Sequence, residues 1–179
     1  MADSRAALRY ARALLGTAQE LKQLDAVNTD VLLIDGLLKG SREFRLFMQS
    51  PVINTQRKKS VFTEVLKGNV SELMFSFLIL LASKKREMIV PEIIEQFKIQ
   101  YDELRGIMNV TLRSVSKFSP EQNTALVKKL QDATKKTVRL EEVTDAALIG
   151  GFTVSYGDTV LDGSVLRQLA VLKQQLTEA

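Results

Sequence analysis

Apolar residues recur every three or four positions through roughly the first hundred residues, the spacing that places them on one face of an α-helix. Short polar or glycine-containing turns separate six such segments, and this pattern predicts an N-terminal six-helix bundle. The first helix is expected over about residues 4–21 and the second over about 24–38. A short third helix is expected through Phe44 and Phe47, ending before Pro51. The fourth is expected to begin at Asn54 and end before Gly68. The fifth is expected to begin at Ser71, and the sixth to run from about Pro91 to Leu104.

The fifth predicted helix differs from the others because it is apolar nearly all round. Its large apolar residues are Leu73, Met74, Phe75, Phe77, Leu78, Ile79, Leu80 and Leu81. A helix without a polar face is typical of the middle of a bundle. We therefore expect this helix to be central.

A different pattern begins after Arg105 and Gly106. Residues 108–113 alternate between apolar and polar side chains, which indicates a half-buried strand. Ser119 and Pro120 then have the signature of a helix start, and the helix is expected to reach about Lys135. A strand over 138–141, a glycine-rich hairpin and a last helix from Ser164 follow. The chain is thus predicted to be mainly α with a small α/β part: a helical bundle over 1–105 and a C-terminal α/β domain over 106–179.

Residues 148–164 contain four glycines near predicted strands, which raises the question of a phosphate-binding loop. A Walker loop needs a lysine after its glycines, and none follows before Lys173. A tight bend at Gly150 and Gly151, with a hairpin turn at Gly157, is the simpler interpretation. If both bend glycines have positive φ, valine at either position would harm folding of the α/β domain.

Composition narrows the chemistry further. The chain has no cysteine and no histidine, which excludes a thiolate nucleophile, a Cys/His zinc site and a histidine base. Asp158 and Asp162 have the setting of turn residues, and no catalytic constellation, metal site or cofactor site emerges. The longest apolar run, from Leu73 to Ala82, is too short to span a membrane, so a soluble protein is expected.

Two kinds of partner remain open. The net charge of +4 comes from 25 basic and 21 acidic side chains in dispersed clusters, which leaves a basic α/β nucleic-acid-binding protein as the alternative. A stripe of Ala7, Ala11 and Ala18 on the first helix has its simplest explanation in packing inside the bundle. The other interpretation is that the stripe borders a groove between the first and fifth helices, which accepts an amphipathic helix from another protein.

The glycine-rich region resembles the δ subunit of the F-type ATP synthase, whose mitochondrial counterpart is the oligomycin-sensitivity-conferring protein. The matching stretches are Val138-Arg139-Leu140, Thr144-Asp145, Leu148 to Val154, Gly157-Asp158 and Val160 to Val165. Weaker matches extend the likeness along nearly the whole chain: Arg9 to Leu14, Ser50 to Ile53, Leu80 to Ala82 with Arg86, and Arg105-Gly106.

The resemblance implies a non-catalytic stator subunit that links the catalytic α/β head to the peripheral stalk, so that proton flow is coupled to ATP synthesis. It implies no cofactor, no nucleic acid and a peripheral position at the cytoplasmic face of the bacterial inner membrane, without insertion. The N-terminal domain would bind N-terminal segments of α subunits, and the C-terminal domain would bind the b subunits. Residues carried over for the α contact are Tyr10, Ala11, Ala13, Leu14, Leu78, Leu80 and Leu81; those for the b contact are Leu169 and Leu172.

Overall fold

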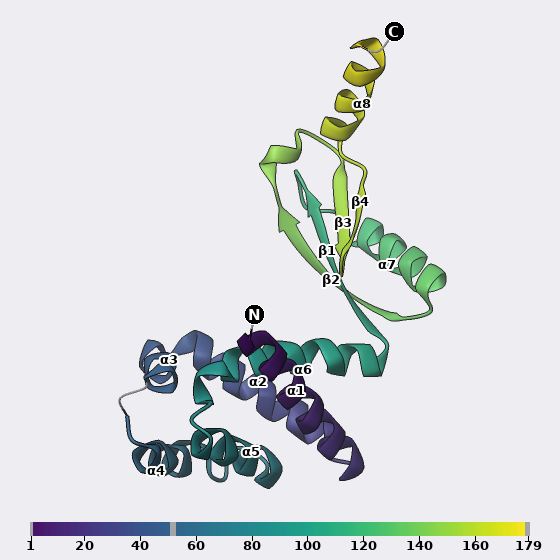
Figure 1. Cartoon of the computed structure of the whole chain (residues 1–179). Coiled ribbons are helices and arrows are strands. Elements are labelled where there is room, and N and C mark those ends of the chain that lie inside the picture. The colour runs from purple at the N-terminus through teal and green to yellow at the C-terminus, as the bar shows by residue number, and fades with distance from the viewer. Residues whose placement is uncertain (1, 51–52, 178–179) are drawn as a thin grey trace. The chain divides into compact units, whose positions relative to one another are not determined.

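The chain divides into two compact units, 1–101 and 102–179 (Figure 1). The computed structural model describes residues 2–50 and 53–177, so Pro51 and Val52 lie outside the described residues. The division falls four residues before the joint expected at 105–106, because Asp102 belongs to the second unit. Its buried carboxylate accepts a hydrogen bond from the amide of Asn109 and lies 3.8 Å from the guanidinium of Arg139.

The first unit is helical, and the six predicted helices are present. They are α1 (Ala2–Glu20), α2 (Leu24–Gly40), α3 (Arg42–Gln49), α4 (Thr55–Leu66), α5 (Glu72–Ser83) and α6 (Val90–Arg105), with a short 3₁₀ turn, η1 (Glu87–Ile89), before α6. The two expected caps are confirmed: the Asn54 side chain accepts from the Gln56 N–H, and the Ser71 hydroxyl accepts from the Met74 N–H. Each cap satisfies a donor that a helix start leaves without an intrahelical partner.

One apolar cluster holds this unit together. The small residues Ala7, Ala11 and Ala18 are fully buried in it, so the alanine stripe packs inside its own unit. Leu14, on the same face of α1, is also buried at 3% exposure, so this face of the helix turns into the core. Other members include Val27, Val31, Ile34, Met48, Phe62, Leu66, Ile93 and Phe97.

The expectation that α5 lies in the middle of the unit is wrong. One face, formed by Met74, Leu78 and Leu81, is buried, while Leu80 remains 46% exposed. Leu73, Phe75, Phe77 and Ile79 are only partly buried. The helix therefore lies at the surface of its unit with an apolar outer side, a feature that often marks a binding surface.

A buried carboxylate ties α2 to the start of α5. Asp30 is 7% exposed, and its Oδ2 accepts a hydrogen bond of 2.9 Å from the backbone N–H of Ser71. The negative charge also lies at the N-terminal end of α5, where the helix dipole favours an anion. Asp30 thus satisfies a backbone donor that would otherwise lack a partner.

We expect Asp30→Ala to lower the free energy of unfolding by about 1–3 kcal/mol, because it leaves the part-buried Ser71 N–H without its hydrogen-bond acceptor. Urea denaturation of the full chain measures the change. Thr29→Ala, at the exposed neighbouring position, is the control and should stay within about 0.5 kcal/mol of wild type. Equal losses in the two variants would contradict the role given to Asp30.

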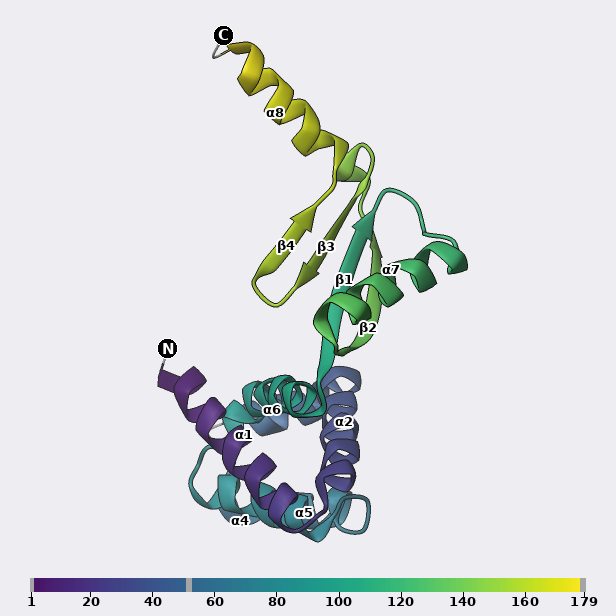
Figure 2. The same cartoon turned by 90° about the vertical axis from the view of Figure 1, so that its right-hand side faces the viewer.

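The second unit is a four-stranded sheet with α7 (Pro120–Thr134) on one face (Figure 2). Its strands are β1 (Ile107–Ser114), β2 (Thr137–Thr144), β3 (Phe152–Tyr156) and β4 (Thr159–Asp162), in the order β2-β1-β3-β4. Strand β1 pairs in parallel with β2, as the α7 crossover requires, and antiparallel with β3. A short 3₁₀ turn, η2 (Ala146–Leu148), precedes β3, and α8 (Val165–Thr177) follows β4.

The core of this unit is small and lies between α7 and the sheet. Val110, Leu112 and Val154 are buried on one face, and Leu126 and Leu130 of α7 pack against them. The predicted start of α7 is confirmed, because Ser119 and Gln122 form a complete capping box with proline in the first turn. Across residues 2–50 and 53–177 the chain is mostly helical, with one small sheet.

The glycine-rich bend differs in part from its prediction. Gly151 has φ +78°, as expected, and Gly157 has φ +52° in the β3–β4 turn. Gly150 does not adopt positive φ; the preceding Ile149 does, at φ 60° and ψ −41°. The Gly150 N–H donates to the Leu148 carbonyl at 2.5 Å, which closes a three-residue γ-turn around Ile149. The sequence could not locate this turn, because an isoleucine rarely adopts positive φ.

Candidate interaction surfaces

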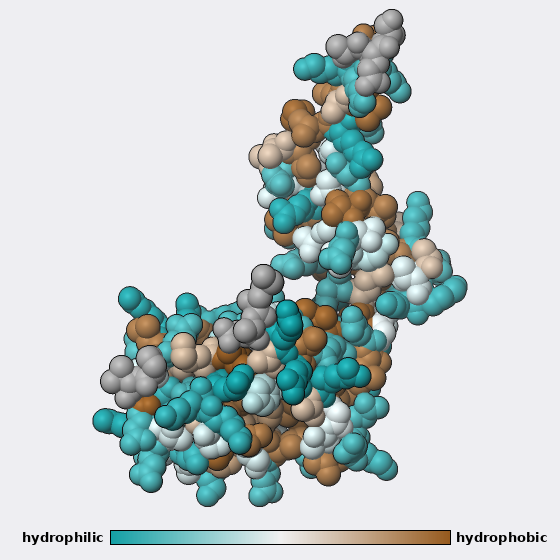
Figure 3. All heavy atoms as spheres, viewed as in Figure 1, coloured by the Kyte–Doolittle hydropathy of each residue, from teal (hydrophilic) through white to brown (hydrophobic). Residues whose placement is uncertain are grey.

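Helix α8 presents an uncovered apolar face. Every residue from 165 to 176 is exposed, including Leu169 at 53% and Leu172 at 54%. Val165, Leu169, Leu172 and Leu176 recur at helical spacing and so share one side of the helix. Figure 3 shows hydrophobic side chains at the surface on α8 and near its base. An apolar stripe left in water on a full helix is typical of a binding site for another helix.

The residues predicted for the α contact fall into two groups. Ala11, Leu14, Leu78 and Leu81 are at most 3% exposed and belong to the core of the first unit, where they are inaccessible to a partner. Helical spacing alone cannot tell which apolar face of a helix turns inward, which is why the sequence grouped core and surface positions. Tyr10, Ala13 and Leu80 remain at least partly accessible.

The accessible residues of α1 border a pocket of about 370 Å³. Its lining is Ala6, Arg9, Tyr10, Ala13 and Arg86. The Tyr10 ring is held edge-on against Phe77 of α5, with ring centroids 6.3 Å apart. Sequence reasoning missed Arg9 and Arg86 as site residues; their two guanidiniums beside small and aromatic side chains make this pocket suited to an acidic, partly apolar segment.

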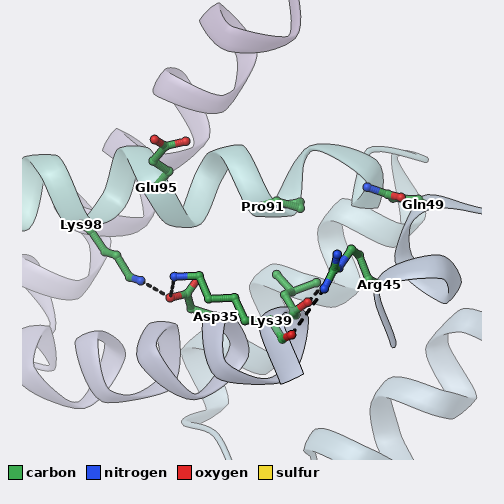
Figure 4. Close-up of a pocket in the computed structure, with 8 residues that line it drawn as sticks. Asp35, Lys39, Arg45, Gln49, Pro91, Glu95 and Lys98 are labelled. Atoms are coloured by element: carbon green, nitrogen blue, oxygen red, sulfur yellow. Dashed lines mark hydrogen bonds and ion pairs between the residues drawn. The ribbon is translucent and has the colours of Figure 1, made fainter. Parts of the chain in front are cut away.

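A larger pocket of about 580 Å³ lies between α2, α3 and α6 (Figure 4). Lys98 and Lys39 both form ion pairs with Asp35, and the Arg45 Nε donates to the Leu38 carbonyl at 3.0 Å. Burial raises the pKa of Asp35, but the hydrogen bonds and charges of the two lysines outweigh it and hold that pKa below its usual value. The cations here are thus engaged within the chain, and we assign the pocket a structural role.

This pocket gives a pH-dependent expectation. Because the pKa of Asp35 is lowered in the folded state, its contribution to stability is present above the unfolded pKa of about 3.9 and is lost as the pH falls through the folded value. In urea denaturation between about pH 6 and about pH 3, we expect Asp35→Asn to be less stable than wild type at the upper end. The difference should shrink towards the acid end; a constant difference would contradict the assignment.

The described residues contain neither a cluster of candidate metal ligands nor a helix suited to crossing a membrane. No cluster of three or more candidate metal ligands occurs in residues 2–50 and 53–177. Across the same ranges, none of the helices is both long enough and apolar enough to cross a membrane. Two folded units, each with an exposed apolar surface, define a binding protein built from a helical unit and an α/β unit.

Comparison with known proteins identifies the family. Residues 6–176 match the family model described as the ATP synthase delta (OSCP) subunit. The chain is 42% identical over 176 residues to ATP synthase subunit delta of Chlorobaculum parvum. The aligned residues make up 98% of this chain and 97% of the relative. It is 39% identical over 168 residues to the same subunit of Chloroherpeton thalassium, with 94% and 92% covered. The chain therefore belongs to the ATP synthase delta (OSCP) family.

A solved structure agrees with this assignment. The fold superposes with a TM-score of 0.78 on a chain of the Toxoplasma gondii mitochondrial ATP synthase hexamer, at 26% identity, covering 96% of this chain and 97% of that one. The protein is a non-catalytic subunit of the peripheral stalk of the F-type ATP synthase. The alternative of a nucleic-acid-binding protein finds no support in these relatives.

Proposed function

We propose that the two units perform the two halves of the stator link: the helical unit binds N-terminal segments of α subunits, and the α/β unit binds the b subunits. The observation that carries the proposal is α8, a helix whose apolar stripe is uncovered along its whole described length. A monomeric protein has no reason to hold such a helix in water, so a partner that covers it is required.

The chemistry of α8 indicates what kind of partner fits. Residues 165–177 contain two basic side chains, Arg167 and Lys173, and no acidic one. The stripe has the 3–4 spacing that packs against another amphipathic helix. A stalk helix with apolar residues at the same spacing and acidic residues at its margins satisfies both requirements. Leu169 and Leu172, at the middle of the stripe, are the expected anchors.

On the helical unit, the supporting surface is the pocket of α1 together with the outer face of α5. Ala13 gives room for a close approach, Tyr10 offers an amphipathic ring, and Leu80 adds apolar area. Arg9 and Arg86 favour an acidic residue in the bound α segment. We assign the contact to these accessible residues, since the four buried candidates contribute to it only by shaping the fold.

We assign the α contact to the six-helix bundle expected over residues 1–105 and the stalk contact to the domain expected over 106–179, a boundary four residues after the division between the two compact units. Two modest contacts on one chain give an avidity that neither contact reaches alone, which suits a link that resists torque. In a bacterial cell the complex would hold the subunit at the cytoplasmic face of the inner membrane.

Calorimetric titration tests the proposal with the full-length chain. An α-subunit N-terminal peptide and the soluble part of the b subunit, both from the same organism, should each bind saturably and without competing. Removing α8 by ending the chain after Ser164 should abolish b binding and leave α-peptide binding unchanged. Binding of b that persists without α8 would refute the assignment.

The α contact has its own test. Ala13→Arg places a bulky charged side chain at the exposed edge of the α1 pocket. It should lower the affinity for the α-subunit peptide by about tenfold or more. Gln19→Arg, exposed on another face of α1, is the matched control and should bind as wild type does. If the two arginine variants bind the peptide equally, the peptide does not use this pocket.

A further inference from the structure

Helix α8 is exposed along its described length, and its contacts with the sheet lie at its first turn. All of residues 165–176 are exposed, whereas the residue immediately before the helix, Ser164, is only 1% exposed. Figures 1 and 2 show α8 projecting from the end of the sheet, attached through the segment that follows β4. Its direction must therefore be determined at its N-terminal end.

Backbone hydrogen bonds connect that end to the glycine-rich bend. The Val165 N–H donates to the Gly150 carbonyl at 3.0 Å, and the Gly163 N–H donates to the Phe152 carbonyl at 2.9 Å. The Asp162 carboxylate accepts from the Ser164 N–H at 2.9 Å, and the Ser164 hydroxyl accepts from the Arg167 N–H at 3.2 Å. These bonds fix both the entry of the chain into α8 and its first turn.

Close backbone contacts complete the attachment. A Cβ added to Gly151 would lie 2.3 Å from the Gly163 carbonyl oxygen and 3.0 Å from the Ser164 Cα. A Cβ added to Gly150 would lie 3.0 Å from the Val165 side chain. The bend thus touches the base of α8 backbone to backbone, which only glycine permits at position 151. The neighbouring γ-turn at Ile149 brings the chain into this position.

We propose that Gly150 and Gly151, together with Gly163 and Ser164, form a rigid mount that sets the direction of α8. These are positioning residues: they act on the partner through the helix. The inference rests on the proposed function for the meaning of that direction, but the mount itself is a property of this chain. Its function is to present the α8 stripe to the stalk in one orientation.

The geometry explains why a rigid mount matters. From Val165 to Leu176 the helix extends about 16 Å, so a tilt of roughly 15° at the base moves the far end by about 4 Å. A displacement of that size exceeds the fit of an apolar side chain into a groove. Pre-orientation also reduces the ordering cost that binding would otherwise incur.

The first measurement follows the direction of α8 without any partner. The chain has no cysteine, so Lys128→Cys on α7 and Gln175→Cys on α8, both at exposed positions, introduce the only two sites for spin labels. Pulsed electron resonance then gives the α7–α8 distance distribution. Gly151→Ala should shift or broaden it, because its Cβ cannot coexist with the present position of Gly163.

A matched control separates the mount from simple backbone strain. Gly157 also has positive φ, at +52°, but a Cβ there meets nothing within 4 Å. Gly157→Ala should therefore lose comparable stability and keep the wild-type distance distribution. If Gly151→Ala fails to fold, Gly163→Ala takes its place in the distance measurement, since its Cβ would lie 3.3 Å from the Phe152 carbonyl oxygen. A folded variant with the wild-type α7–α8 distance distribution would refute the proposal that these residues set the direction of α8.

The second measurement uses the soluble part of the b subunit. Gly151→Ala should weaken its binding by about tenfold or more, and Gly157→Ala by less than about twofold. Wild-type affinity in a variant whose α8 has moved would refute the functional meaning of the mount. If the wild-type protein itself binds no b fragment, the proposed function is refuted. The distance measurement still tests whether the mount sets the direction of α8, because it needs no partner.

Discussion

Replacing Lys58 with methionine is expected to cost the helical unit about 3–5 kcal/mol of its free energy of unfolding. Lys58 is 1% exposed, and its ammonium forms an ion pair with Glu87 and donates to the Ser50 carbonyl at 2.6 Å. It therefore joins α4 to η1 and to the end of α3. Without the lysine, the Glu87 carboxylate is left buried and unpaired, and one of its oxygens already lacks a partner among the described residues.

The double variant Lys58→Met/Glu87→Met gives this prediction its sharpest form. Removing both charges replaces the pair with apolar side chains, which is often neutral or stabilising, so most of the lost stability should return. Arg57→Met, at the exposed neighbouring position, is the control and should change stability little. Urea denaturation measures all three, and a double variant no more stable than Lys58→Met would refute the explanation.

The largest expected effect on binding comes from Leu169→Asp. This change places a charge in the middle of the α8 stripe and should weaken binding of the b subunit by about a hundredfold, the range of a central hot spot. Folding should be unaffected, because Leu169 is 53% exposed and takes no part in either core. Thermal unfolding checks the fold, and calorimetric titration with the soluble part of b checks the affinity.

Val171→Asp is the matched control for that substitution. Val171 is 47% exposed and lies two residues further on, about 200° around the same helix. Val171→Asp thus introduces the same negative charge on a different face of the helix. Because valine is a weaker helix former than leucine, the control loses less helix propensity, and circular dichroism of both variants checks that α8 remains helical. Equal losses of affinity from Leu169→Asp and Val171→Asp would mean that the stripe does not select the face that binds.

Periodicity along the chain predicted the elements because local rules decide them. Helix spacing predicted α1 to α6, the Ser119 and Gln122 pair predicted the start of α7, and alternation predicted β1. These signals depend on neighbours a few residues apart, which the sequence displays directly. The glycine-rich string also carried the family resemblance, which the comparisons confirm.

The candidate site was less accessible to such reasoning. Leu78 and Leu80 are two residues apart on one apolar helix, yet the first is buried and the second is 46% exposed. Only the packing of α5 against its neighbours separates them. Arg86 reaches the α1 pocket from a turn 73 positions after Ala13, and no local pattern links two such distant residues.

By itself, then, the sequence determined the helices and strands, the absence of cysteine and histidine chemistry, and the family. The tertiary structure decided which apolar residues are core and which remain for partners, and it placed Gly151 against Gly163 at the base of α8. The physical reason is that backbone conformation follows from neighbours in the chain, whereas burial depends on residues that only folding brings together.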